Sequence, residues 1–225
     1  MRVSHRGRVV SLLVMRLFLL GASGKTGRHL TELALARGHS VTAFVRSPGK
    51  INQRHPLLSI VRGDPRSSDE LARQLPGHDA VLSTLGVRLP QAFRRHTLVE
   101  DCAASTIAAM ERVGVERYVL LSAAVLFPLP GLRFVFFRWL LQHISRDLGA
   151  AEKLVRATQL AWTIVRPPRL VERADERYRS ARDALPIDGF VMSFRAVAAF
   201  MLDAAQERTH VRETIGLAGA LSSRG

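Results

Sequence analysis

The feature that most constrains this chain is a glycine-rich loop between an expected strand and an expected helix. The loop follows the apolar run 16–20 and precedes leucines and alanines at helical spacing up to residue 37. Three glycines at this spacing allow a tight turn, a close backbone approach to a pyrophosphate, and close packing of the helix on the strand. The phosphates would lie at the positive N-terminal end of the helix. The loop therefore predicts dinucleotide binding by Gly21, Ala22, Ser23, Gly24, Lys25, Thr26 and Gly27.

A P-loop is the nearest competing interpretation, because Gly24-Lys25-Thr26 has the ending of that motif. A P-loop needs a further glycine about five residues before Gly24. That position is Leu19, inside the expected strand. No later expected strand ends in an evident magnesium-binding aspartate, so a site of the kinase or nucleotidase type is disfavoured.

The end of the second expected strand, residues 41–45, indicates which nicotinamide dinucleotide is preferred. Arg46 and Ser47 follow this strand, where an acidic residue would bind the ribose 2′-hydroxyl of NAD. The guanidinium of Arg46 instead suits the 2′-phosphate of NADP, with the Ser47 hydroxyl and the charge of Lys50 nearby. We therefore expect NADP(H) in preference to NAD(H); a solvated loop arginine is the alternative interpretation.

Apolar runs and helical patterns alternate along the rest of the chain. Further strands are expected at 58–61, 80–84, 117–122, 162–165 and 213–217, and further helices at 68–75, 97–113, 148–158 and 194–205. The polar stretch 169–188 is expected to be a surface excursion. Short connections between alternating strands and helices predict an α/β fold: a Rossmann-type doubly wound parallel sheet in a single three-layer α/β/α domain.

We expect this NAD(P)-binding domain to span residues 15–225 and residues 1–14 to be an appendage outside the fold. The appendage has arginines before an apolar run, as a signal peptide does. However, Arg16 ends the run and no small-residue cleavage site follows before the glycine loop. No run reaches the roughly 18 apolar residues of a membrane helix, so no transmembrane segment is expected.

Composition narrows the expected partners and compartment. Lys+Arg 33 against Asp+Glu 19 gives a formal net charge of +14, which raises nucleic acid as a partner. The arginines are scattered and only 6% of residues are aromatic, unlike a clustered nucleic-acid site, so an anionic small molecule is favoured. The single cysteine, Cys102, allows no internal disulfide and predicts a cytoplasmic protein. The eight histidines lack metal-ligand spacing, so no metal is expected.

Several short motifs extend beyond the glycine loop. They are Val45-Arg46-Ser47, Gly63-Asp64, and the stretches 79–86, 114–122, 161–168 and 194–198. Together they resemble the atypical short-chain dehydrogenase/reductase family with NmrA-like domains, in particular its biliverdin-IXβ/flavin reductase type. The resemblance implies Gly63 and Asp64 against the adenine, Leu85 and Gly86 in the cofactor trough, and Ser122 beside the nicotinamide. Arg166 and Pro167 are also expected to face the cofactor.

The expected reaction depends on which proton donor the chain offers. Typical short-chain dehydrogenases use Tyr-x-x-x-Lys to protonate a carbonyl, but here Tyr118 is followed by Ser122 and Tyr178 by Arg182. Hydride transfer to a flavin or quinone asks less of the protein, because the proton can come from solvent or a nearby hydroxyl. Ser122 is therefore the catalytic candidate; a small polar residue that ends the strand is the alternative interpretation.

Two functions follow from this pattern. The first is an NADPH-dependent oxidoreductase that reduces a flat, hydrophobic small molecule. The second is a non-catalytic NADP(H)-binding redox sensor or assembly protein of the NmrA-like type. It is kept because Arg169 stands where flavin reductases carry histidine, and arginine releases no proton near neutral pH. The apolar segment 127–141 is expected to be core or pocket wall, with membrane-surface contact as the alternative. The acceptor and the oligomeric state are not predicted.

Overall fold

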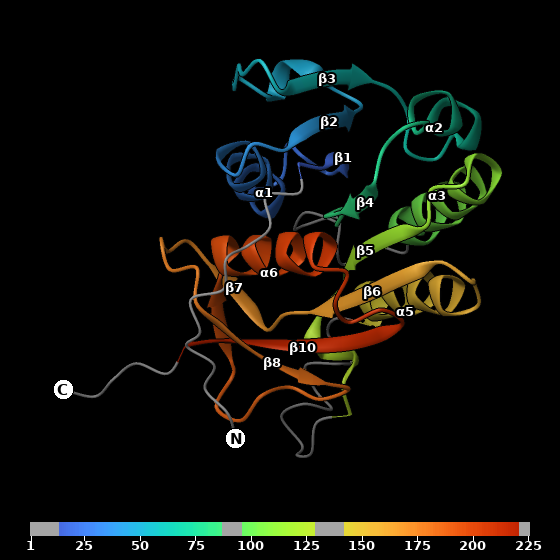
Figure 1. Cartoon of the computed structure of the whole chain (residues 1–225). Coiled ribbons are helices and arrows are strands. Elements are labelled where there is room, and N and C mark those ends of the chain that lie inside the picture. The colour runs from blue at the N-terminus through green and yellow to red at the C-terminus, as the bar shows by residue number, and fades with distance from the viewer. Residues whose placement is uncertain (1–13, 87–95, 129–141, 221–225) are drawn as a thin grey trace.

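The computed structural model of the protein describes residues 14–86, 96–128 and 142–220 (Figure 1). Strands and helices alternate through most of this length. In chain order the elements are β1 (Arg16–Leu20), α1 (Lys25–Ala36), β2 (Ser40–Val45), η1 (Pro48–Lys50), β3 (Leu58–Arg62), α2 (Ser68–Gln74), β4 (Ala80–Ser83), α3 (Leu98–Val113), β5 (Arg117–Leu121), η3 (Ala124–Leu126), α5 (Gln142–Arg156), β6 (Ala161–Arg166), β7 (Arg169–Val171), β8 (Tyr178–Arg182), β9 (Val191–Ser193), α6 (Phe194–Gln206) and β10 (Glu213–Gly219).

Eight strands form one sheet in the order β3-β2-β1-β4-β5-β6-β10-β8. Neighbouring strands are parallel except β10 and β8, which are antiparallel. The strand order reverses between β1 and β4, and open α/β sheets bind ligands outside the carboxyl ends of their strands at such a point. The predicted doubly wound parallel sheet is confirmed.

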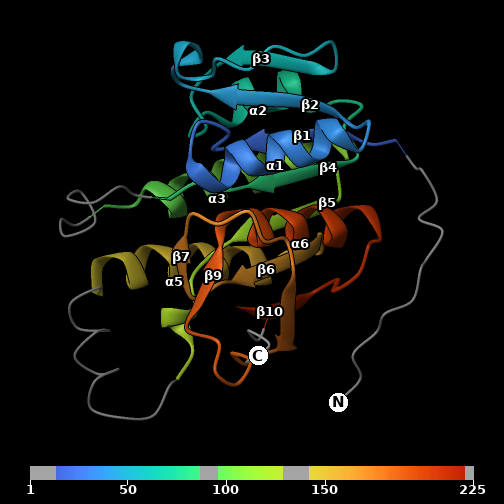
Figure 2. The same cartoon turned by 90° about the vertical axis from the view of Figure 1, so that its left-hand side faces the viewer.

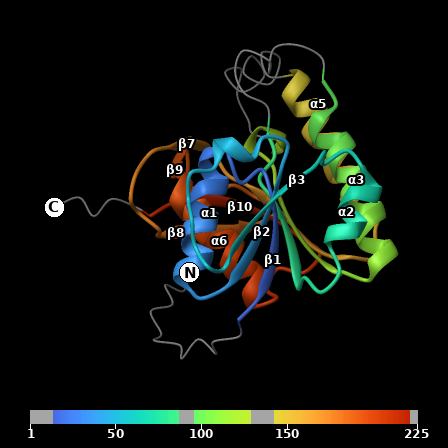
Figure 3. The same ribbon diagram turned by 90° about the horizontal axis from the view of Figure 1, so that it is seen from above.

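Helices cover both faces of the sheet and bury its strands from two sides. Seen from above, α1 and α6 lie on one face, and α2, α3 and α5 lie on the other (Figure 3). Alternate residues of β1 enter different cores: Leu17 and Leu19 pack in the cluster with α1 and α6, whereas Phe18 and Leu20 pack with α2, α3 and α5. A strand buried on both faces has a continuous apolar sequence, as residues 17–20 do.

The structure differs from the sequence expectations in two places. First, α5 begins at Gln142, six residues before the expected start at 148, because this polar first part gives no apolar pattern to read. Second, the expected surface excursion 169–188 contains β7 and β8. β8 is an edge strand whose residues are half-buried or exposed, and edge strands commonly carry charges. The arginines of β8 are therefore typical of an edge strand, although in the sequence they indicated a loop. Figure 2 shows β7 and β9 beside α6.

Two expectations concern residues at the borders of the described ranges. Val14 is exposed, whereas Met15 is buried and its backbone N–H donates to Nδ1 of His39 at 3.2 Å. The rest of the expected appendage, residues 1–13, lies outside the described residues. So does most of the apolar segment 127–141, of which Phe127 is described and buried. In the described part of the chain, no helix combines the length and apolar character that crossing a bilayer requires.

Candidate functional site

The glycine loop joins β1 to α1 in a conformation that larger residues would disrupt. Gly21 has φ +83°, and a Cβ there would lie 2.7 Å from Oγ1 of Thr84, the residue directly after β4. The backbone N–H of Gly24 donates to the carbonyl of Gly21 at 2.9 Å. A Cβ on Gly27 would overlap that same carbonyl oxygen. The two outer glycines therefore let the loop close tightly against β4 and against the first turn of α1.

The start of α1 is suited to an anion. Its N-cap residue is Gly24, which has no side chain to satisfy the first backbone N–H groups, and its first turn has no acidic residue. Such a helix end carries partial positive charge and free donors. Lys25 adds an exposed ammonium, which lies 3.8 Å from Glu172 and over the ring of Phe194. These features fit the pyrophosphate of a dinucleotide.

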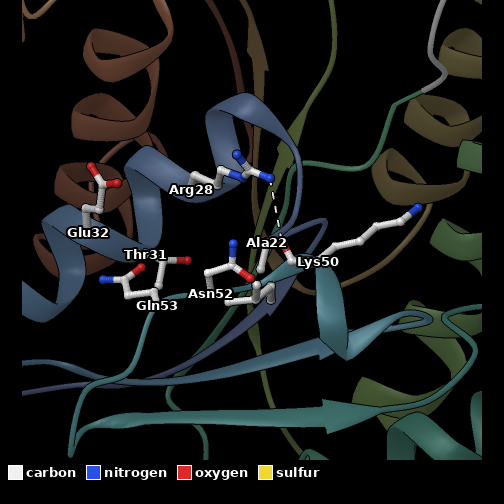
Figure 4. Close-up of a pocket in the computed structure, with 8 residues that line it drawn as sticks. Ala22, Arg28, Thr31, Glu32, Lys50, Asn52 and Gln53 are labelled. Atoms are coloured by element: carbon white, nitrogen blue, oxygen red, sulfur yellow. Dashed lines mark hydrogen bonds between the residues drawn. The ribbon is translucent and has the colours of Figure 1, made fainter.

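A cavity of about 190 Å³ lies between α1 and the residues that follow β2 (Figure 4). It is lined by Ala22, Arg28, Thr31, Glu32, Lys50, Ile51, Asn52 and Gln53. Arg28 donates to the backbone carbonyl of Lys50 at 3.5 Å, and the Lys50 side chain extends away from the Arg28 guanidinium (Figure 4). The carboxylate of Glu32 is paired with His29 and Arg195 at 3.6 and 3.8 Å.

The residues that the sequence predicts beside the ribose and the adenine of the cofactor lie at the carboxyl ends of β2 and β3. Arg46 and Ser47 are exposed where β2 ends. Gly63 is confined, because a Cβ there would overlap the ring of Phe44. The backbone N–H of Asp64 donates to the carboxylate of Glu70 at 3.0 Å. Sequence reasoning missed Arg28, although its position directly after the third glycine was a usable signal.

Ser122 lies at the carboxyl end of β5 and is buried. Its Oγ donates to Oε1 of Glu152 on α5 at 2.6 Å. Arg166 donates two hydrogen bonds to the same carboxylate, from Nε at 2.9 Å and from a terminal nitrogen at 2.6 Å. Arg156 donates to Glu152 Oε2 at 3.0 Å. Four hydrogen bonds therefore converge on a carboxylate that is 3% exposed, and sequence reasoning gave Glu152 no role.

The other residues that were expected to face the cofactor near Ser122 differ in their burial and contacts. Arg166 is tied to Glu152 and stacks over the ring of Phe127 at 4.6 Å from its centroid, so its guanidinium supports the site from within the protein. Pro167 is buried and accepts the backbone N–H of Ala124 at 2.8 Å. Leu85 is half-buried and Gly86 exposed after β4, the neighbour of β5 in the sheet. All lie at the edge where the parallel strands end.

A protein-family model described as NAD(P)H-binding matches residues 21–208, which begin at the first glycine of the loop and cover most of the chain. The chain belongs to the NAD(P)H-binding family. Its affiliation with the atypical short-chain dehydrogenase/reductases of the NmrA-like type is confirmed at the family level.

Relatives of this NAD(P)H-binding chain come from distant organisms. Oxidoreductase stcQ of Emericella nidulans is 29% identical over 222 residues, which cover 86% of this chain and 79% of that protein. The chloroplastic protein At2g34460 of Arabidopsis thaliana is 28% identical over 163 residues, 68% of this chain. The match spans 58% of the Arabidopsis protein's length. A solved structure from Bacteroides thetaiotaomicron, described as an epimerase, is 27% identical with a TM-score of 0.77, and the alignment covers 94% of this chain and all of that one.

Proposed function

We propose that the protein is an NADPH-dependent oxidoreductase that reduces a flat, hydrophobic small molecule such as a flavin or a quinone. The observation that carries the proposal is the tight glycine loop that contains Gly21 and Gly27 at the start of α1. This loop and the buried Ser122 both lie at the carboxyl ends of the parallel strands. A dinucleotide whose pyrophosphate lies at the start of α1 can extend along that edge from β2 and β3 towards β4 and β5.

The charges beside the ribose side favour NADP(H) over NAD(H). Arg46 is exposed directly after β2, and Arg28 and Lys50 line the cavity between α1 and that segment. The guanidinium groups of Arg46 and Arg28 suit a 2′-phosphate, and the planar guanidinium of Arg46 can bind it with paired donors. The carboxylate at that cavity, Glu32, already pairs with His29 and Arg195.

At the other end of the site, Ser122 orients the reacting ring. The bound dihydronicotinamide supplies the hydride. The proton of Ser122 Oγ is engaged with Glu152 at 2.6 Å, which leaves the oxygen's lone pairs as hydrogen-bond acceptors. Arg166 and Arg156 fix Glu152, and Glu152 in turn fixes Ser122. We therefore assign Ser122 to contact with the nicotinamide and Glu152 to the positioning of Ser122.

The absence of the usual acid–base pair supports an acceptor more easily reduced than a simple ketone. Within Gln142–Arg156, which form α5, the sequence has no tyrosine. Epimerisation, which the Bacteroides structure's description raises, needs a protein acid–base group to move a proton. A conjugated ring takes hydride without that assistance.

The alternative is an NADP(H)-binding redox sensor that does not turn over. It is favoured by Arg169, which is exposed in the position of the flavin reductases' histidine. In this case the loop and cations bind the cofactor as above, and the readout is a change in a partner's binding.

One titration and one assay separate the two functions. The purified protein is titrated with NADPH and with NADH, followed by nicotinamide fluorescence. Oxidation of NADPH is then measured with FMN and with a panel of quinones. Binding with acceptor-dependent oxidation supports the oxidoreductase, and binding without oxidation of any acceptor supports the sensor. Failure to bind either dinucleotide contradicts both.

A further inference from the structure

Glu172 joins the end of strand β7 to the start of helix α1. It directly follows β7 and lies 143 residues from His29 in the sequence. Its Oε1 lies 3.1 Å from Nε2 of His29, and its Oε2 lies 3.8 Å from Nζ of Lys25. Because a carboxylate can only accept hydrogen bonds, Nε2 of His29 is the donor. Lys25 is the first residue of α1 and His29 lies one turn further along it, so Glu172 lies beside the helix end that follows the glycine loop.

Helix α1 has no acid of its own at this end. Its N-cap is Gly24, which has no side chain, and its first turn contains no acidic residue. The start of a helix carries partial positive charge, which a nearby anion stabilises. Glu172 supplies such an anion from a distant segment and also lies next to the ammonium of Lys25. A pyrophosphate at the glycine loop would interact with the same two positive groups, the helix end and Lys25.

The contact between Glu172 and Lys25 is of a kind that exchanges readily. The two side chains are 60% and 68% exposed, and solvated ion pairs of this kind contribute little to stability. A pyrophosphate carries more negative charge than a carboxylate and accepts backbone N–H groups at the helix end as well. Lys25 can therefore turn from Glu172 to the phosphates, while Glu172 keeps its shorter contact with His29.

We propose that Glu172 competes with the pyrophosphate of the dinucleotide for Lys25 and the start of α1, and so sets the affinity of the site for its cofactor. This inference rests on the proposed function, which places the pyrophosphate at the start of α1, but not on the identity of the acceptor. Because His29 keeps the Glu172 carboxylate near the phosphates, the carboxylate continues to repel them after the exchange. The site then binds its cofactor less tightly than the glycine loop and Lys25 would alone, which speeds the departure of the oxidised dinucleotide after turnover.

The first test is the dissociation constant for NADPH in Glu172→Gln. The amide oxygen of glutamine still accepts from His29, so the contact between β7 and α1 is kept while the charge is removed. We expect the dissociation constant to fall about threefold, the size of one exposed charge interaction, and this gain to shrink as added salt screens the charges. The melting temperature should stay that of the wild type, because the pair with Lys25 is exposed.

The matched control is Glu116→Gln. Glu116 is an exposed glutamate 3.7 Å from Arg208, and it directly precedes β5. It therefore lies at the amino ends of the parallel strands, on the opposite edge of the sheet from the glycine loop. Glu116→Gln changes the net charge by the same amount as Glu172→Gln, and we expect it to bind NADPH with wild-type affinity. An equal gain in affinity in the two variants would overturn the proposal, because it would show an effect of net charge alone.

A comparison of NADPH with NADH tests whether Glu172 acts at the pyrophosphate. Both dinucleotides carry the pyrophosphate, whereas only NADPH carries the 2′-phosphate. We therefore expect Glu172→Gln to tighten the binding of both by the same factor. A gain for NADPH alone would assign the repulsion to the ribose phosphate and overturn the proposal. An unchanged or raised dissociation constant for NADPH would overturn it as well.

A double-mutant cycle tests the role of Lys25. Lys25→Gln should weaken the binding of both dinucleotides. If Glu172 acts through Lys25, Glu172→Gln gives a smaller gain in the Lys25→Gln background than in the wild type, because the contested cation is gone. An equal gain in both backgrounds overturns the competition for Lys25.

The same titrations separate this inference from the proposed function. Failure of the wild type to bind either dinucleotide contradicts the proposed function itself, and the role of Glu172 fails with it. Binding of NADPH without reduction of any acceptor contradicts only the oxidoreductase, and the predicted gain in affinity in Glu172→Gln is then still expected. Binding by the wild type with no gain in Glu172→Gln contradicts only the role of Glu172.

Discussion

Ser122 Oγ donates a 2.6 Å hydrogen bond to Oε1 of the buried Glu152. This contact joins the end of β5 to the middle of α5, thirty residues further along the chain. Because Arg166 donates to both oxygens of the same carboxylate, the position of Ser122 depends on side chains of α5 and β6 as well as on β5.

Replacing Glu152 with glutamine should destabilise the protein through Arg166. The Arg166 side chain is 12% exposed, and without its counter-ion it becomes a nearly buried unpaired charge. Losing one partner of a buried pair costs about 3 kcal/mol, which urea denaturation of Glu152→Gln measures. The control is Arg156→Gln, because Arg156 is 42% exposed and an exposed pair contributes less than about 1 kcal/mol. Equal losses in the two variants would contradict this account of Glu152.

Reversing the charge of Arg46 should change the cofactor preference. In Arg46→Glu we expect the dissociation constant for NADPH to rise at least about tenfold, or about 1.4 kcal/mol, because the carboxylate repels a 2′-phosphate. NADH lacks that phosphate and should bind as before or more tightly. The matched control is Arg208→Glu, an exposed arginine near Glu116. An unchanged ratio of NADPH to NADH affinity in Arg46→Glu would show that Arg46 is a solvated loop residue.

A single methyl group at Gly27 should damage the start of α1. Its Cβ would overlap the carbonyl oxygen of Gly21, so the loop or the helix must shift, at a cost of about 1–3 kcal/mol. We expect Gly27→Ala to lower the melting temperature and to weaken NADPH binding. Gly49→Ala is the control for stability, because a Cβ there meets nothing within 4 Å. Equal melting temperatures for Gly27→Ala and Gly49→Ala would show that the overlap with the Gly21 carbonyl does not affect stability.

Stability should fall as the solution becomes acidic, in part through His39. Burial lowers the pKa of His39 below its ordinary value of 6.5, so the unfolded chain binds a proton more readily than the folded protein. The contribution of His39 is present above pH 6.5 and is lost as the pH falls from there towards the lowered pKa. The free energy of unfolding, measured by urea denaturation from about pH 7.5 to about pH 5, should show this loss.

The variant that tests this assignment is His39→Gln, in which the loss of stability should be smaller. His55→Gln is the control because His55 is exposed. An identical pH dependence in the wild type and His39→Gln would exclude His39 as a source.

Local patterns predicted the parts of the fold and site that depend on neighbours in sequence. The spacing of Gly21, Gly24 and Gly27 indicated the turn between β1 and α1, and the end of β2 indicated Arg46. Glu152 and Glu172 could not be found this way. Their partners Ser122 and His29 are 30 and 143 residues away, and the contacts form only when α5 packs beside the end of β5 and β7 lies beside the start of α1.

The position of β10 affects when the protein can fold. β10 (Glu213–Gly219) lies between β6 and β8, both of which precede it in the chain. While the ribosome has not yet released residues 213–219, β6 and β8 each expose an unpaired edge that can join other nascent chains. The half of the sheet from β3 to β5 can assemble earlier during synthesis. We expect the chain to benefit most from chaperones after β3 to β5 have assembled and before β10 pairs with β6 and β8.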